Sequence, residues 1–141
     1  MENIKEQLIR HEGLRLTVYD CPAGYKTIGV GRNLEEKGIT KEEAMHLLNN
    51  DIKEFESSLV NSFSWFSDLD EARRNALINM AFNLGMGGIK KFRKMISAIE
   101  EKNWTEASEQ MLDSKWAKQV GRRAIELSDM MRHGNKLDRE N

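Results

Sequence analysis

The stretch that decides the fold is HEGLRLTVYDCPAGYKTIGVGR, residues 11–32. A short helix with one apolar stripe ends inside it at Gly13, and apolar and polar side chains then alternate over residues 14–19. Residues 21–24 include a proline and a glycine, which are typical of a turn, and residues 25–28 continue the strand pattern. The stretch therefore predicts a β-hairpin attached to the end of a helix.

Chemically reactive side chains surround this hairpin at three positions. Glu12 lies at the junction of helix and hairpin, and Thr27 lies on the second strand. Asp20 and Cys21 are both at the hairpin tip, opposite Thr27. Because side chains alternate between the two faces of a strand, the pattern places Asp20 on the apolar face and Cys21 on the polar face. This favours Cys21 as the residue of a site, with Asp20 as the alternative.

Two glycines flank Val30 directly after the second strand. Gly29 and Gly31 would let the strand bend, or would let a ligand approach the backbone closely. A plain bulge is the other interpretation of the same pattern.

The order of Glu12, Cys21 and Thr27 resembles a known family. A glutamate, eight residues, an aspartate or cysteine, five residues and a threonine form the pattern of the lysozymes of tailed bacteriophages, glycoside hydrolase family 24. The likeness continues through four ordered blocks, GITKEEA (residues 38–44), ALINMAF (76–82), WTEA (104–107) and RRA (122–124). The resemblance therefore covers nearly the whole chain.

This resemblance implies an α+β, predominantly helical fold, in which a long helix joins a small β-hairpin lobe to a larger helical lobe. It implies a single lysozyme-like domain over residues 1–141, with the small lobe at about 13–50 and the helical lobe at about 1–12 and 61–141. The family's T-even phage member carries a helical insertion before the connecting helix that is absent here. The small lobe is therefore expected to be shorter and its side of the cleft more open.

The residues themselves predict the helices of this fold. The segment from Thr40 to Glu43 has the form of a capping box and starts a helix that reaches about Val60. The pattern is helical from Asp68 onward, with a buried central helix that is ended by Gly85, Gly87 and Gly88. Shorter helices are expected over residues 92–102, 104–112, 115–119 and 122–132, and the tryptophans and most methionines are expected in the core rather than on a sugar-binding surface.

The resemblance also gives roles to the hairpin residues. Glu12 would be the general acid, Cys21 the second catalytic group and Thr27 the residue that orients water. Cys21 would act either as a thiolate nucleophile or by positioning water, and Asp20 would replace it if the turn rotated inward. The structural alternatives are a solvated glutamate at a helix end, a small buried cysteine and a β-branched strand residue.

Three positions outside the hairpin match further residues of the family's site. Arg123 matches the arginine that pairs with the catalytic glutamate, so an ion pair between Arg123 and Glu12 is expected. The alternative is a solvated surface arginine. Phe82 and Asn83 match positions that line the sugar-binding cleft, although Phe82 also fits an ordinary core position.

Arg32 stands where the T-even member has a histidine with an acidic partner. Asp51, near the middle of the connecting helix, matches that partner. An ion pair between Arg32 and Asp51 is therefore expected.

Composition excludes several classes of function. A net charge of −1 provides no basic excess for binding nucleic acid. The single cysteine suits a reducing compartment, and no cleavable signal or run of about 18 apolar residues is found. The three histidines show no metal-binding spacing, so no metal or other cofactor is expected. We therefore expect a cytoplasmic chain without membrane insertion.

The predicted function is that of an endolysin, a muramidase that cuts the β-1,4 bond between N-acetylmuramic acid and N-acetylglucosamine in peptidoglycan during host-cell lysis by a phage or prophage. The resemblance implies a monomer that stays in the host cytoplasm until a holin releases it to the periplasm and cell wall. Two alternatives stay open. One is a Cys21-dependent hydrolase of wall peptides, which needs His11 as its base. The other is an inactive wall-binding module.

Overall fold

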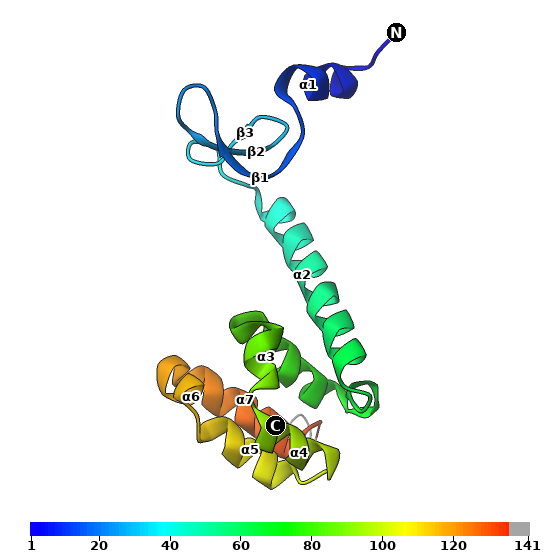
Figure 1. Ribbon diagram of the computed structural model, residues 1–141, viewed down its shortest axis with the longest axis vertical. Helices are drawn as coiled ribbons and strands as arrows, with labels where there is room; N and C mark the ends of the chain where they lie inside the picture. Colours follow the sequence, from blue (N-terminus) through cyan, green and yellow to red (C-terminus); the bar gives the residue numbers. More distant parts are fainter. Residues whose placement is uncertain (136–141) are drawn as a thin grey trace. The chain divides into compact units, whose positions relative to one another are not determined.

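The computed structural model describes residues 1–135 of a predominantly helical α+β protein with one small sheet (Figure 1). The predicted fold class is thus confirmed. The elements in chain order are α1 (Ile4–Glu12), β1 (Arg15–Asp20), β2 (Lys26–Gly29), β3 (Arg32–Asn33), α2 (Lys41–Ser62), the 3-10 helix η1 (Phe66–Asp68), α3 (Glu71–Lys90), α4 (Arg93–Glu100), α5 (Trp104–Leu112), α6 (Lys115–Val120) and α7 (Arg122–His133).

Contacts divide the chain into two compact units, and the division falls inside α2. The hairpin unit is Met1–Leu47, and the helical unit begins at Leu48. The prediction that residues 1–12 belong with the helical lobe stays a prediction.

Local hydrogen bonds and turns determine the structure of the hairpin unit. Asn3 and Glu6 form a capping box at the start of α1, and Gly13, with a φ of 80°, ends this helix. Strands β1 and β2 pair antiparallel as predicted, while the short β3, which the sequence pattern did not indicate, completes the sheet in the order β1-β2-β3. Thr27 is the one buried residue of this unit.

The predicted capping box at the start of α2 is confirmed. The Thr40 hydroxyl oxygen accepts a hydrogen bond from the Glu43 amide at 3.1 Å, and Glu43 Oε1 accepts one from the Thr40 amide at 2.9 Å. These bonds satisfy backbone donors that the first helical turn cannot use internally. The helix continues to Ser62, close to its predicted end.

The helical unit is built around an apolar core. Helix α3 buries residues such as Leu77 and Met80, and α7 packs against α3, α5 and α6. The predicted end of α3 at Gly85, Gly87 and Gly88 is only partly right, because a φ of 75° at Gly85 interrupts the helix but the helix resumes through the other two glycines as far as Lys90. The largest other buried side chains are Leu59, Phe66, Ile89, Met95, Ile99, Met111, Trp116, Leu127 and Met131.

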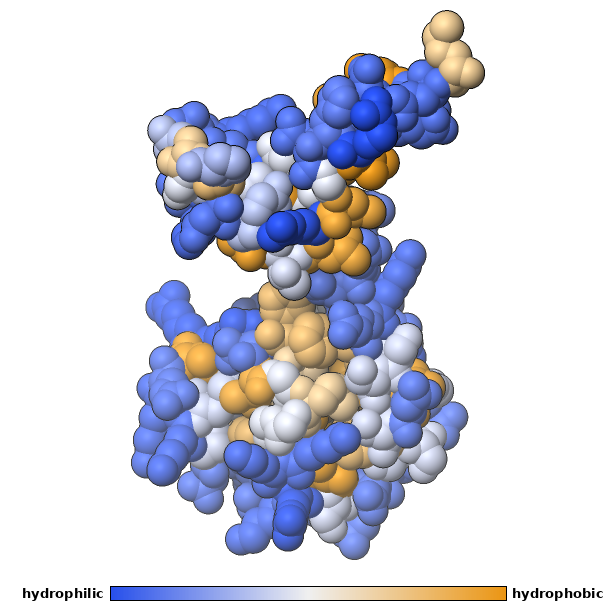
Figure 2. All heavy atoms as spheres, turned by 45° about the horizontal axis from the view of Figure 1, so that its top comes forward, coloured by the Kyte–Doolittle hydropathy of each residue, from blue (hydrophilic) through white to orange (hydrophobic). Residues whose placement is uncertain are grey.

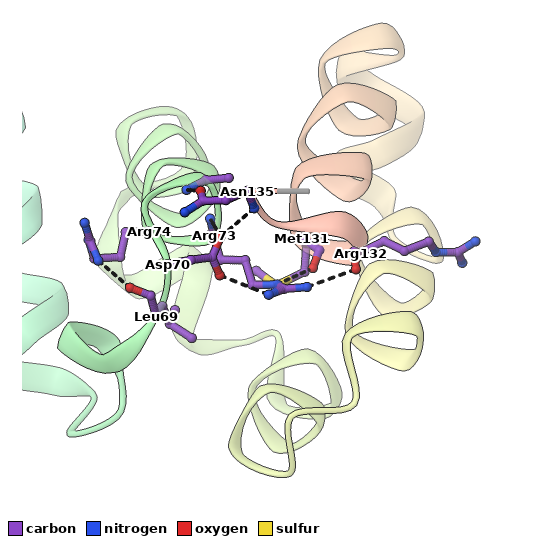
Figure 3. A network of polar contacts seen from close by, with 8 residues as sticks. Leu69, Asp70, Arg73, Arg74, Met131, Arg132 and Asn135 are labelled. Atoms are coloured by element: carbon purple, nitrogen blue, oxygen red, sulfur yellow. Dashed lines mark hydrogen bonds and ion pairs between the residues drawn. The ribbon is translucent and has the colours of Figure 1, made fainter. Parts of the chain in front are cut away.

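Arg73 joins the start of α3 to the end of α7 (Figure 3). Its guanidinium donates to the carbonyl oxygens of Met131 at 2.7 Å and Arg132 at 3.0 Å, and it forms an ion pair with Asp70 at 3.0 Å. Asp70 also accepts a hydrogen bond from the Asn135 amide at 3.0 Å. Side chains at the start of α3 thereby give hydrogen-bond partners to backbone groups at the end of α7, which would otherwise lack them.

Within residues 1–135, no helix has the combination of length and hydropathy that a bilayer-spanning segment needs.

Candidate active site

A pocket of about 590 Å³ lies within the hairpin unit, between the end of α1, the β1–β2 turn and β3. Glu12, Asp20, Cys21 and Thr27 all line it. The structure thus brings together the four hairpin residues that the sequence pattern indicated. His11, Arg15, Tyr19, Pro22, Gly31 and Asn33 complete the lining.

Glu12 is the last residue of α1 and is exposed at the pocket. Within residues 1–135, no hydrogen bond or ion pair engages its carboxylate. Arg123, in the helical unit, donates instead to the side chain of Asn79 at 2.9 Å and to its carbonyl oxygen at 3.3 Å. The expected ion pair between Arg123 and Glu12 involves both units and stays a prediction.

The β1–β2 turn surrounds the Cys21 thiol with backbone donors. The Tyr25 amide donates to Cys21 Sγ at 3.4 Å and lowers the pKa of the thiol, although partial burial opposes this effect. The backbone of Ala23 and Gly24 lowers the same pKa further. Because hydrogen bonds to the charged form favour it, the turn promotes a reactive thiolate.

Asp20 lines the same pocket, but its carboxylate already has a partner. Asp20 Oδ1 lies 2.6 Å from Lys26 Nζ, and the two residues face each other across the β1–β2 ladder. The carboxylate raises the pKa of Lys26, first through this hydrogen bond and then through its charge. The Asp20 carboxylate is thus already engaged by a cation, and the choice between Cys21 and Asp20 as the second catalytic group stays a prediction.

Thr27 is 2% exposed, and its hydroxyl donates to the Tyr25 carbonyl oxygen at 2.8 Å. The same carbonyl accepts from the Cys21 amide at 2.9 Å. The Tyr25 peptide group therefore holds both residues in place. No pattern in the sequence indicates this role, because a backbone function leaves no signal in side-chain type. The donated hydrogen leaves the Thr27 oxygen able to accept a hydrogen bond from water.

Phe82 and Asn83 lie on α3 in the helical unit. Phe82 is 43% exposed, with its ring centroid 5.7 Å from that of Phe55, so the interpretation of Phe82 as ordinary core is wrong. The Asn83 side-chain oxygen accepts a hydrogen bond from Trp116 Nε1 at 2.8 Å, which fixes the amide orientation. The roles of both residues in sugar binding stay predictions.

Arg32 pairs with Glu43 at 2.9 Å and donates to the Gly38 carbonyl oxygen at 3.1 Å. Glu43 lies in the first turn of α2, within the same unit as Arg32. The expected pair between Arg32 and Asp51 involves both units and stays a prediction. Hydrogen bonding to Arg32 and then to the Thr40 amide lowers the pKa of Glu43 to about 2.

Residues 1–135 contain no group of three or more His, Cys, Asp or Glu side chains placed to hold a metal ion. Among its chemical groups the pocket offers two carboxyl groups, from Glu12 and Asp20, the Cys21 thiol and the Thr27 hydroxyl, a set that fits acid-assisted hydrolysis.

Comparison with known proteins agrees with this chemistry. The family described as phage lysozyme matches residues 9–134, and the chain belongs to that family. It is therefore a glycoside hydrolase of the lysozyme type.

Three relatives show how far the similarity extends. A probable T4-type lysozyme from Dictyostelium discoideum is 30% identical, and the match covers 95% of this chain and 96% of the relative. The pre-baseplate central spike protein Gp5 of Enterobacteria phage T4 is also 30% identical, over 94% of this chain but 28% of that protein. An endolysin of Acyrthosiphon pisum secondary endosymbiont phage 1 is 29% identical over 77% of this chain and 73% of the relative.

The alignment with the Dictyostelium protein spans 164 positions, more than the 141 residues of this chain. That relative therefore contains residues that this chain lacks.

Proposed function

We propose that this chain is an endolysin that hydrolyses the β-1,4 bond between N-acetylmuramic acid and N-acetylglucosamine in peptidoglycan, so that a phage or prophage can lyse its host. One observation carries the proposal. In a chain of the phage lysozyme family, Glu12, Cys21 and Thr27 have the family spacing and line one pocket.

Glu12 donates its proton to the glycosidic oxygen as the bond to the anomeric carbon breaks, and one sugar leaves with a hydroxyl group. Charge then develops on the other sugar, which needs a group on its opposite face. In one route the Cys21 thiolate attacks the anomeric carbon, and water later displaces it while giving its proton to the Glu12 carboxylate. In the other route the thiolate positions the attacking water and takes its proton. Thr27 accepts a hydrogen bond from the water and so aims its lone pair at the carbon.

Residues of the helical lobe complete the proposed site. Arg123 orients the Glu12 carboxylate, and Phe82 and Asn83 contact the sugars. This arrangement needs residues 1–12 to pack with residues 61–141.

The proposed working cycle begins in the host cytoplasm and ends at the periplasm and cell wall. A holin opens the route, and the protein acts as a monomer on the wall polysaccharide. The need for such release is tested by comparing how the protein lowers the turbidity of permeabilised cells and of cells with intact membranes.

The deciding experiment measures products from purified Gram-negative peptidoglycan. Wild type should release new sugar reducing ends and no new amino groups, and Glu12→Gln should abolish this release. Glu101→Gln, at an exposed carboxylate outside the pocket, is the matched control and should keep full activity. Amino groups without reducing ends would instead support the Cys21 peptide hydrolase with His11 as base. Wall binding without any hydrolysis would support the inactive module.

Alkylation tests the second catalytic group. Because the turn lowers the pKa of Cys21, iodoacetamide should modify it at a lower pH than it modifies free cysteine, and lysis should be lost in parallel. Full activity after complete alkylation would exclude a catalytic role for the thiol.

A further inference from the structure

Gly31 lies in the turn between β2 and β3, directly against the side chain of Glu12. Its φ of +65° is in the left-handed region. A Cβ atom at this position would lie 2.9 Å from Glu12 Oε2 and 3.2 Å from both Cγ and Cδ. The Glu12 carboxyl group thus occupies the space that any side chain at position 31 would need.

Within the hairpin unit, the Gly31 backbone is a close neighbour of the Glu12 carboxylate. Within the described residues no hydrogen bond or ion pair engages the Glu12 side chain. Gly31 lines the same pocket as Cys21 and Thr27, so the turn forms a wall on the Glu12 side of it.

We propose that Gly31 is a positioning residue for Glu12. Its bare backbone sets how far the carboxyl group reaches toward the scissile oxygen. This inference rests on the proposed function, in which Glu12 is the general acid. A general acid must come within about 2.6–3.2 Å of the atom that it protonates. A misplacement of about 1 Å costs on the order of 100-fold in rate.

The chain offers a matched control two residues earlier. Gly29 also has a left-handed φ, +70°, but a Cβ atom there would meet nothing within 4 Å. Alanine at either position therefore strains the backbone to a similar degree, and alanine at position 31 alone displaces Glu12. The difference between the two variants isolates the contact with Glu12.

The experiment compares kcat and KM of wild type, Gly29→Ala and Gly31→Ala on soluble peptidoglycan fragments, with reducing ends as the readout. We expect Gly31→Ala to lower kcat at least about tenfold below Gly29→Ala, with KM unchanged within about twofold, because the acid moves but sugar binding does not. Thermal unfolding should be alike for the two variants. Equal kcat values would overturn the proposal.

A double-mutant cycle separates a positioning role from a general structural one. Glu12→Asp shortens the acid by one methylene group, so it should cost much activity in wild type but less in Gly31→Ala, where the shorter side chain avoids the added methyl group. In Gly29→Ala the cost should equal that in wild type. Additive effects at position 31 would contradict the proposal.

A second pair of variants and the activity of wild type distinguish a failure of the Gly31 proposal from a failure to fold or of the proposed function. If alanine prevents folding, Gly31→Asn and Gly29→Asn replace the pair, because asparagine tolerates a left-handed φ. An inactive wild type would contradict the proposed function itself. An active wild type with an inactive Glu12→Gln, together with equal activities of the position 29 and 31 variants, would contradict only the role of Gly31.

Discussion

Different kinds of interaction stabilise the hairpin unit and the helical unit internally. The helical unit buries apolar side chains such as Met80 and Leu127 almost completely, whereas Thr27 alone is buried in the hairpin unit. Helix caps, turn hydrogen bonds and the Arg32–Glu43 pair hold the hairpin unit in shape. Short-range backbone geometry, rather than packing against an apolar core, therefore positions the residues of the pocket.

The apolar side chains of the hairpin unit remain at its surface. Leu14, Leu16 and Val18 are 59%, 82% and 53% exposed, and Figure 2 shows apolar atoms, in orange, on the surface of this unit. Nothing within the unit covers this face of β1. The stability of the hairpin unit should therefore depend little on these side chains, unless they are covered in solution.

Truncating the core should give the largest effect. Leu127→Ala leaves a cavity in the helical unit and should lower the free energy of unfolding by about 2–5 kcal/mol. Leu16→Ala removes the same atoms from an exposed strand and should change it by less than about 0.5 kcal/mol. Urea unfolding measures both. A comparable loss for Leu16→Ala would mean that the apolar face of β1 is covered in solution.

The next largest effect should be a loss of catalytic rate when pocket residues of the hairpin unit are substituted. Cys21→Ser should lower the rate of reducing-end release by about 100-fold, because serine lacks an accessible anion at neutral pH. Asp20→Asn removes only an exposed partner of Lys26 and should change the rate by less than about threefold. Neither substitution should alter unfolding. The reverse order of activities would assign the second catalytic role to Asp20.

The same contrast explains what the sequence could predict. Apolar periodicity located the helices of the helical unit, and the capping box of Thr40 and Glu43 located the start of α2. The spacing of Glu12, Cys21 and Thr27 placed them around one pocket because a hairpin has few possible geometries.

Other features of the hairpin unit could not be predicted, because they depend on contacts that leave no pattern in the sequence. The pairing of Arg32 with Glu43 follows from where α2 begins, and the two-residue strand β3 is too short to show a periodic pattern. Gly31 was expected to let the strand bend or a ligand approach the backbone, and in the structure the Glu12 side chain lies against it.

The link between α3 and α7 should give a smaller effect than core truncation. Arg73→Gln removes an ion pair with Asp70 and at least one bond to a carbonyl oxygen at the end of α7, so it should cost about 1–3 kcal/mol of unfolding free energy. Arg93→Gln, at an exposed arginine with no ion pair among residues 1–135, is the control. Activity per folded molecule should not change. A loss of activity without destabilisation would contradict a purely structural role for Arg73.

The smallest effect should be the charge of Glu43 in the hairpin unit. Because the pKa of folded Glu43 is about 2, below that of an unfolded glutamate, its pair with Arg32 stabilises the protein above pH of about 4.5 and loses this contribution as the pH falls toward 2. Glu43→Gln keeps an acceptor for the capping box and removes only the charge, so it should destabilise slightly at pH 6 and not at pH 2. Amide exchange of Thr40 and Glu43 measures this locally, and 1 M salt should shrink the difference at pH 6 because the pair is partly exposed. An equal difference at both pH values would show that residue 43 acts through its shape alone.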